Sequence, residues 1–220
     1  MSDLKKQEPY YIQFYHMLKQ MIFDGKYQPG DRINETYLAK KYNVSKSPIR
    51  EAIRILEKEG LLIVENSKMV VYEPTLKDMK DIYHCRMALE SFAVRLTTKF
   101  ASDAQLEEIS KILNETEKTI KEEQDSNKII TLNEKFHSLI LASTENERLQ
   151  KQVQDLKGLI NYFRILNFQG EGRAETILNQ HRKIFEFIKV RDHEQAAAEM
   201  IRHLEMDVEH LISVLPDNFE

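Results

Sequence analysis

The stretch PGDRINETYLAKKYNVSKSPIREAIRILEKEGLL, residues 29–62, determines the fold of the first part of this 220-residue chain. Pro29 and Gly30 mark a turn, after which Tyr37, Leu38 and Tyr42 give a short helix a small apolar stripe. The next residue, Asn43, tolerates the left-handed backbone of a tight turn. A second helix follows at once, an arrangement that suits a protein laying one helix in the major groove of DNA.

The second helix has a start signal and an apolar stripe of its own. Ser47 is expected to cap it, and Pro48 to occupy its first position, where a missing N–H costs nothing. Ile49, Ile53 and Leu56 recur at helical spacing and should face the core. The pattern therefore leaves one face of this helix to polar side chains.

That polar face is basic. Lys46, Arg50 and Arg54 lie away from the apolar stripe, where they can meet phosphates and base edges. Residues 40–54 hold five Lys and Arg against one acid, Glu51. An ordinary helical pair with a solvated charged face is the alternative interpretation.

The residues after Gly60 change to a strand pattern. Leu62–Val64 and Met69–Val71 are β-prone runs, and the four residues between them, 65–68, read Glu-Asn-Ser-Lys. This pattern predicts a β-hairpin, of the kind called a wing when it follows two such helices. The hairpin favours DNA binding over the alternative.

Charge is distributed unevenly along the chain. The net charge is −4, but residues 1–74 hold 12 Lys and Arg against 10 Asp and Glu, a balance of +2. Residues 75–220 hold the other 20 and 26, a balance of −6. A weakly basic first part can bind DNA through one face. Its low charge predicts that binding needs a homodimer on two half-sites of a palindromic operator.

Composition bounds the location of the chain. No apolar stretch approaches the ~20 residues that span a bilayer, so no membrane partner is expected. The N-terminal MSDLKKQEPYY has no apolar signal core, which predicts a cytoplasmic location. Cys85 is the only cysteine, so it cannot form an internal disulfide, and we expect it to be a buried, reduced thiol.

A domain boundary is predicted at Pro74, because Thr75 can cap a new helix. Residues 1–74 form the expected DNA-binding domain, and residues 75–220 form a second domain. The second domain is helical throughout, with helices expected at 76–99, 103–123, 127–143, 146–168, 173–190 and 193–214. The predicted fold class is therefore mainly α: a winged helix-turn-helix followed by an antiparallel all-helical bundle.

Three histidines of the second domain lie on apolar faces of three different helices. His137 stands among apolar residues, His181 lies in the stripe formed with Ile177 and Ile184, and His203 lies beside Leu204. A histidine on such a stripe is usually a packed core residue. Three imidazoles that converge are also good ligands for a divalent transition metal, and spacing alone leaves both interpretations open.

The first domain resembles the winged helix-turn-helix of GntR-family bacterial transcription regulators over residues 18–62. The motifs are Ile22/Gly25, Pro29-Gly30, Glu35/Leu38-Ala39, Val44 to Ile53 (VSKSPIREAI) and Glu57/Glu59-Gly60-Leu61. The resemblance implies operator contacts by residues of the two helices, to which the basic face adds Arg54: Thr36, Ser45, Lys46, Ser47, Arg50 and Arg54. Two departures matter: Lys46 replaces the usual Arg, and the hairpin tip lacks its usual Gly.

The second domain resembles the FCD domain, the effector domain of the FadR-type branch of that family. Its motifs are Arg86/Leu89/Glu90, Asn133/Phe136/His137/Asn146 and His181/Ile184/His203. In metal-binding members an Asp and three His hold a divalent ion, and an organic acid completes the shell. The resemblance thus implies zinc, nickel or manganese at His137, His181 and His203, with Asn133 in place of the Asp. Asp207 is expected to be a solvated or outer acid.

Arg86 is the predicted clamp for the carboxylate of the effector, because a guanidinium fork matches a carboxylate with two hydrogen bonds. The alternative is an ion pair within the helix with Glu90, four residues on. The resemblance implies a dimeric regulator that acts as a repressor, the commoner behaviour in the family, and whose second domain binds a small carboxylate effector and mediates dimerisation.

Two other functions stay open. A metal-free regulator could bind a more apolar effector, because Asn133 brings no charge to the ion. A metal-dependent helical-bundle enzyme is the second rival. The sequence has no HExxH motif and no pair of Glu-x-x-His motifs, so no catalytic residues are predicted.

Overall fold

The computed structural model describes residues 8–215, and it separates into two compact units between Pro74 and Thr75. We call residues 8–74 the head and residues 75–215 the body. Each unit has its own core and is described by itself. In the part of the chain that is described, no helix has both the length and the apolar character needed to cross a bilayer.

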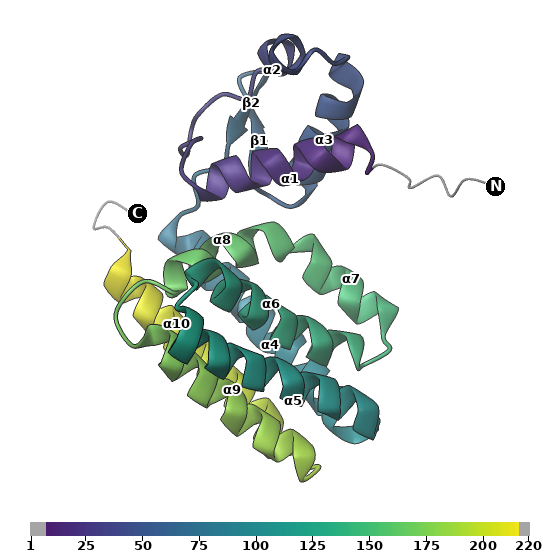
Figure 1. Cartoon of the computed structure of the whole chain (residues 1–220), viewed down its shortest axis with the longest axis vertical. Helices are drawn as coiled ribbons and strands as arrows, with labels where there is room; N and C mark the ends of the chain where they lie inside the picture. Colours follow the sequence, from purple (N-terminus) through teal and green to yellow (C-terminus); the bar gives the residue numbers. More distant parts are fainter. Residues whose placement is uncertain (1–7, 216–220) are drawn as a thin grey trace, which may run out of the picture. The chain divides into compact units, whose positions relative to one another are not determined.

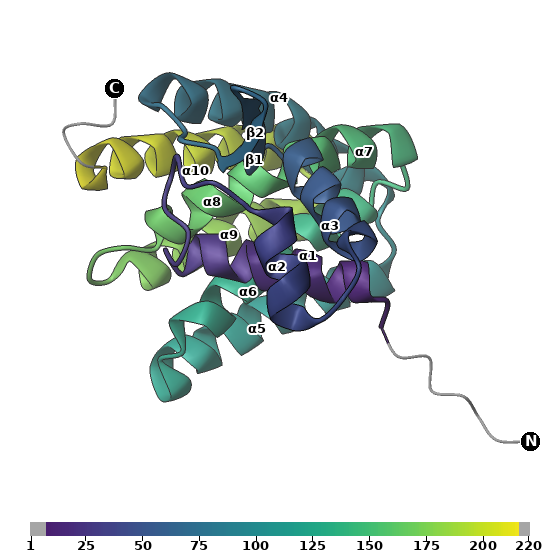
Figure 2. The same ribbon diagram turned by 90° about the horizontal axis from the view of Figure 1, so that it is seen from above.

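The head contains three helices and a hairpin (Figure 1, Figure 2). Its elements are α1 (Tyr10–Phe23), α2 (Glu35–Tyr42), α3 (Lys46–Lys58), β1 (Leu62–Glu65) and β2 (Lys68–Val71). α1 packs on α3. The core is made of the apolar stripes of these two helices, with Leu38 of α2 added: Phe14, Leu18, Ile22, Ile49, Ile53 and Leu56. The predicted winged helix-turn-helix is confirmed.

Local signals fix the turn between α2 and α3. The side chain of Asn34 accepts a hydrogen bond from the Tyr37 N–H at the start of α2. Asn43 ends α2 with a φ of 51°, the left-handed conformation expected of it. The prediction for Ser47 was wrong, because α3 begins at Lys46 directly after Ser45. Tyr37 is 58% exposed, so it lies outside the core stripe assigned to it.

The hairpin is antiparallel, with Leu62 opposite Val71 and Glu65 opposite Lys68. Only Asn66 and Ser67 remain in its turn, and both have positive φ, 49° and 61°. Two consecutive left-handed residues form the turn type that matches strand twist, although Gly is usual at its second position. The strands thus reach one residue closer to the tip than the sequence predicts.

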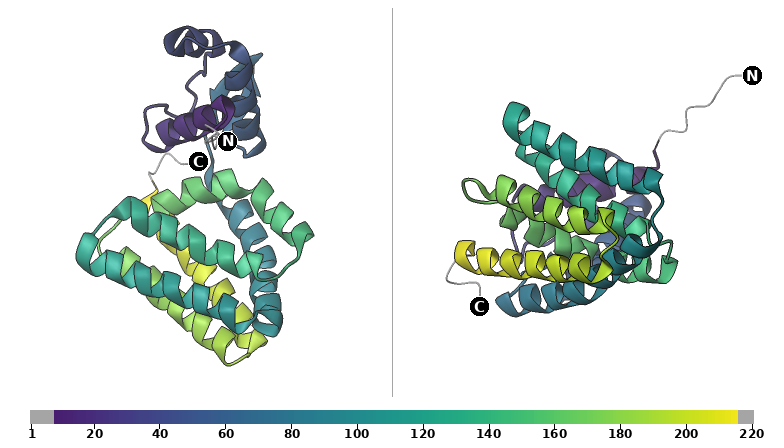
Figure 3. Two further views of the ribbon diagram at one scale, coloured as in Figure 1. Left: turned by 45° about the vertical axis from the view of Figure 1, so that its right-hand side comes forward. Right: turned by 90° about the horizontal axis from the view of Figure 1, so that it is seen from below.

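The body is an all-helical bundle (Figure 3). Its elements are α4 (Leu76–Phe100), α5 (Asp103–Lys118), η1 (Thr119–Glu123), α6 (Ser126–Ala142), α7 (Glu147–Asp155), α8 (Lys157–Asn167), α9 (Arg173–Lys189) and α10 (His193–Val214). Thr75 and Asp78 form a capping box at the start of α4, and Asp192 caps α10. The prediction of a helical second domain is confirmed.

Three details of the body differ from the sequence-based prediction. The helix expected over 103–123 changes at Thr119 to a π-helical turn. The helix expected over 146–168 is broken at Leu156, which separates α7 from α8. Cys85 is exposed rather than buried. No proline marks either break, and the one glycine nearby, Gly158, lies inside α8, so the sequence pattern runs across both breaks.

The core of the body lies among the inner faces of its helices. α10 packs along α4 and α9, and α5 packs between α6 and α9. Among the fully buried side chains are Tyr83, Phe136, Phe163 and Ile140. Because α6, α9 and α10 all turn a face to this core, polar side chains on those faces are brought together there.

Candidate functional site

The head presents the predicted DNA-contacting residues on one exposed surface. α3 buries Ile49, Ala52, Ile53 and Leu56 and exposes its other face. All six residues for which operator contact is predicted have exposed side chains: Thr36 on α2, Ser45 before α3, and Lys46, Ser47, Arg50 and Arg54 on α3. The amphipathicity of α3 therefore delivers the basic face that a recognition helix requires.

Arg50 is held by an acid of the neighbouring helix. Its Nη2 and Nε donate to Glu35 Oε2 at 3.0 and 3.3 Å. Both side chains are partly open to solvent, so the pair contributes little to stability. It does fix the direction in which the guanidinium points, which the sequence pattern could not reveal.

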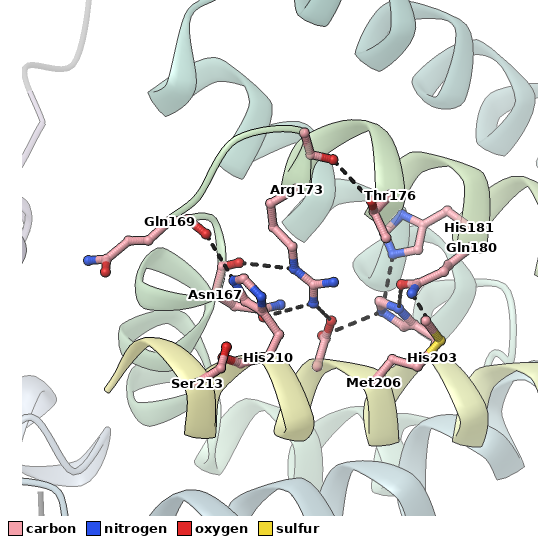
Figure 4. Close-up of polar contacts among 12 residues, drawn as sticks. Asn167, Gln169, Arg173, Thr176, Gln180, His181, His203, Met206, His210 and Ser213 are labelled. Atoms are coloured by element: carbon pink, nitrogen blue, oxygen red, sulfur yellow. Dashed lines mark hydrogen bonds and ion pairs between the residues drawn. The ribbon is translucent and has the colours of Figure 1, made fainter. Parts of the chain in front are cut away.

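The body gathers the three predicted histidines in its core. His137 comes from α6, His181 from α9 and His203 from α10, and all three are buried. One ring nitrogen of each lies within 4.8 Å of the others. The Nε2 atoms of His181 and His203 are 3.3 Å apart, and Figure 4 draws the contact between the two rings. Two nitrogens bound to one tetrahedral ion at ~2.1 Å would lie ~3.4 Å apart.

Burial keeps these imidazoles neutral. It lowers the pKa of His137, lowers that of His181 further, and lowers the pKa of His203 to about 4. A neutral imidazole has the free lone pair that a metal ion needs. The three rings are thus in the protonation state of ligands at neutral pH.

Neighbouring polar groups orient two of the rings. His203 Nδ1 lies 2.7 Å from Gln180 Oε1, so an Nδ1–H can donate there and leave the Nε2 lone pair free (Figure 4). His137 Nδ1 lies 2.7 Å from Glu90 Oε2, although the two atoms lack hydrogen-bond alignment. Such outer partners are typical of metal-binding histidines. The donor set therefore fits a divalent transition metal.

Asn133 and Asp207 are the two candidates for a fourth ligand. Asn133 is buried one turn before His137 on α6, so the two side chains leave the helix in the same direction. Asp207 is also buried, and not solvated as expected. Its Oδ1 accepts from Arg173 at 2.6 Å, while its Oδ2 lies 3.7 Å from His203 Nε2. Arg173 thus holds Asp207 beside the histidines.

Arg86 adopts the alternative that the sequence left open. It is buried on α4, and its Nε donates to Glu90 Oε1 at 2.7 Å. Burial opposes the charge of Glu90, but Arg86 and His137 outweigh it and hold the pKa of Glu90 well below its usual value. Arg86, Glu90 and His137 therefore form one buried chain of contacts.

A cavity of about 60 Å³ lies next to this chain. A cavity of that size can hold several water-sized groups. Glu90 and His137 stand on its wall together with Asn161, Arg164 and Lys157, and the rest of the wall is largely apolar. Arg86 does not line it. Nothing in the sequence distinguishes Asn161 and Arg164 from other polar residues of α8, although both side chains are buried.

Two protein families match the chain. Residues 81–206 match the FCD domain, and residues 10–70 match the family described as bacterial regulatory proteins, gntR family. YdhC of Bacillus subtilis (strain 168), an uncharacterized HTH-type transcriptional regulator, is 45% identical over 100% of both chains. The gluconate operon transcriptional repressor of the same organism is 28% identical over 80% of this chain and 74% of its own length.

Solved structures share the fold. McbR/YncC of E. coli superposes with a TM-score of 0.77 at 21% sequence identity, covering 94% of this chain and 99% of that one. A likeness at that identity supports the arrangement of head and body helices within each unit. It says nothing about ligands.

Proposed function

Because this chain belongs to the gntR family of bacterial regulatory proteins and carries an FCD domain, we propose that it is a repressor controlled by a small organic acid. It is a DNA-binding transcription regulator, and its relatives are regulators rather than enzymes. The observation that carries the proposal is the cluster of three buried, neutral imidazoles beside a cavity in the body. Two relatives that are named as repressors support repression rather than activation.

In the proposed complex, a homodimer places two copies of α3 in successive major grooves of a palindromic operator. Thr36, Ser45 and Ser47 contact the backbone or base edges, and Lys46, Arg50 and Arg54 supply positive charge. Lys46 acts as a point charge and not as a two-pronged fork, which weakens its discrimination of guanine. Exposed phenylalanines on α4, Phe92 and Phe100, support a contact between copies.

The proposed metal site uses His137, His181 and His203, with the amide oxygen of Asn133 as fourth ligand. Zinc, nickel or manganese accept such a set. The metal would be structural and ligand-binding: it would tie three helices together and hold one end of the effector. A neutral set binds M²⁺ more weakly than one with a carboxylate, and Asp207, the acid beside His203, is already paired with Arg173.

The effector acts, in this proposal, by a population shift. It binds in the cavity beside His137 and favours one arrangement of the two heads of the dimer, while the operator favours another. The difference between the binding free energies of the effector in the two arrangements sets how far operator affinity changes.

A metal-free regulator with a more apolar effector is the second candidate. The cavity wall favours it in part, because Ile140, Leu141, Val153 and Ile160 contribute apolar surface. In that case the imidazoles would be packing residues, and replacement of one would leave ligand binding intact.

Selection from a random duplex library tests the DNA half of the proposal. The purified chain should enrich sequences with two inverted half-sites about one helical turn apart, or a multiple of it. An Arg50→Ala, Arg54→Ala double variant should enrich none. Recovery of no sequence by the wild type would refute the regulatory function.

Elemental analysis of untagged protein tests the metal. The wild type should carry one equivalent of a transition metal, and His137→Ala should lose it. His84→Ala, which removes an exposed imidazole from α4, should keep it. A wild type that takes up no metal, even from excess M²⁺, would leave the metal-free candidate.

A further inference from the structure

Arg164 is a buried cation without an acid beside it. Its side chain comes from α8 and is 5% exposed. Its only recorded hydrogen bond within residues 8–215 goes to the neutral Asn161 Oδ1, and no described carboxylate lies within 4.0 Å of it. Burial and the charge of Arg86 lower its pKa, while the charges of Glu134 and Glu90 raise it.

The other buried arginines of the body show the contrast. Arg86 pairs with Glu90 at 2.7 Å, and Arg173 pairs with Asp207 at 2.6 Å. The carboxylates of Glu90 and Asp207 are thus already paired, and neither is paired with the guanidinium of Arg164. An unpaired buried charge is strongly unfavourable. A bound anion would pair with such a charge and stabilise the folded protein.

Arg164 also lies where such an anion can arrive. It lines the cavity together with Asn161 and His137. Lys157, half-exposed on the same wall, is paired with Glu134 at 2.7 Å. The cavity therefore joins a cationic group on α8 to the histidine cluster on α6.

We propose that Arg164, oriented by Asn161, binds the carboxylate of the effector, and that Arg86 is a positioning residue that acts through Glu90 on His137. The inference rests on the proposed function and names its specificity-determining residue. It moves the clamp from Arg86, where the sequence predicts it, to α8. The ligand class is a small carboxylate whose other polar group faces His137.

The carboxylate is preferred to other anions for reasons of shape and charge. A guanidinium fork binds a flat carboxylate with two parallel hydrogen bonds, and a cavity of about 60 Å³ suits a small acid. Arg86, Arg164 and Arg173 against Glu90 and Asp207 leave one positive charge before any metal ion is counted, and a bound carboxylate reduces it. Phosphate shares this chemistry and is separated from carboxylate by experiment.

Thermal unfolding without added ligand gives the first test. Arg164→Met removes the unpaired charge and should raise the unfolding temperature by about 2–4 °C. Arg164→Gln, which keeps a donor for Asn161, should do the same. Arg86→Met leaves Glu90 without its cation and should lower the temperature. If both Arg164 variants unfold at lower temperatures than the wild type, Arg164 is a structural residue and the proposal fails.

Acetate is the probe for the ligand, because it presents the carboxylate alone. At ionic strength matched with chloride, sodium acetate should raise the unfolding temperature of the wild type and of Arg86→Lys. Arg164→Met should show no acetate-specific shift. A wild type that ignores acetate, or an Arg164→Met variant that responds like the wild type, overturns the proposal. A response to inorganic phosphate but not to acetate overturns the carboxylate assignment.

The positioning role has a separate measure. Glu90→Gln should weaken metal affinity about 10–100-fold in chelator competition, because His137 loses its outer partner. Arg86→Met should weaken it too, and Arg86→Lys should restore part of it. Unchanged metal affinity in Glu90→Gln would exclude this role.

The operator selected from the random library separates the two levels of inference. The acetate test compares the wild type with Arg164→Met and does not depend on operator binding. If an operator is selected but acetate acts equally on both proteins, only the Arg164 assignment fails. If no operator is selected, the proposed function fails, whatever acetate does.

Discussion

His203 shows how burial prepares a single residue for its chemistry. Inside the body its pKa falls to about 4, from a usual value of 6.5, because desolvation penalises the charged ring. Its Nδ1 faces Gln180, so the nitrogen that faces His181 can be the one without a proton. The same burial that creates a ligand also creates a sensitivity to acid.

The metal-free protein should lose stability as pH falls from about 6.5 towards about 4. Over that range His203 is protonated in the unfolded chain but stays neutral in the folded chain, because folding lowers its pKa. Acid therefore favours unfolding. His203 alone contributes roughly 3 kcal/mol by this route, and full stability is present above pH 6.5. Urea unfolding of chelator-treated protein across this range measures it. His203→Gln should show a shallower slope, and an equal slope would contradict the argument.

Glu35 is expected to tune how Arg50 reads DNA. Glu35→Gln frees the guanidinium and removes a negative charge near the operator, so affinity should rise by up to about fivefold, with weaker discrimination against altered half-sites. Fluorescence anisotropy with the selected operator and its single-base variants measures both. Glu51→Gln removes the same charge from α3 but leaves the pair intact. Identical specificity in the two variants would show that the pair has no role.

At the scale of elements, the hairpin turn carries a local cost. Ser67 holds a φ of 61°, which glycine adopts without strain. Ser67→Gly should therefore stabilise the head by about 0.5–1 kcal/mol, visible in urea unfolding. Asn66→Gly is the matched control and should gain less, because Asn tolerates this conformation. A loss of stability in Ser67→Gly would mean that its side chain has a role in the turn.

The sequence predicts best those helix ends that are fixed by contacts between residues close together in the chain. Asn43, Thr75 and Asp192 end or begin helices through contacts within a few residues, so their sequence signals are sufficient. The break at Leu156 and the π-helical turn at Thr119 have no such capping signal, so the sequence pattern runs across both. The Ser47 prediction failed by two residues because Ser45 offers an equally good start.

The site is predictable only in part for the same reason. Spacing places each of the three histidines on an inner face, but only the register between α6, α9 and α10 brings their nitrogens within 4.8 Å. The resemblance to the FCD domain supplied that convergence in advance. Nothing in the sequence distinguishes Arg164 from the paired arginines, because its lack of a partner is a property of the folded core.

For the whole molecule, metal removal is expected to loosen the body. One ion tied to three helices stabilises the folded state by about 2.7 kcal/mol at a free concentration one hundred times its Kd. Chelation should then lower the unfolding temperature by roughly 5–10 °C, which calorimetry measures. His84→Ala should show the same fall and His137→Ala none. A chelator effect that persists in His137→Ala would place the ion elsewhere.

The capping box at Thr75 has a mechanical consequence. It starts α4 at Leu76, so only four residues, 72–75, lie between the end of β2 and a helix of about 37 Å. Arg86 and Glu90 lie on α4, and the first turn of α4 is the start of the body. We therefore expect a displacement at the ligand cavity to reach the head through α4 and this short connection. A few glycines inserted after Pro74 should uncouple the two units. The head would keep its affinity for DNA and the body its affinity for ligand, but binding to one would no longer change binding to the other.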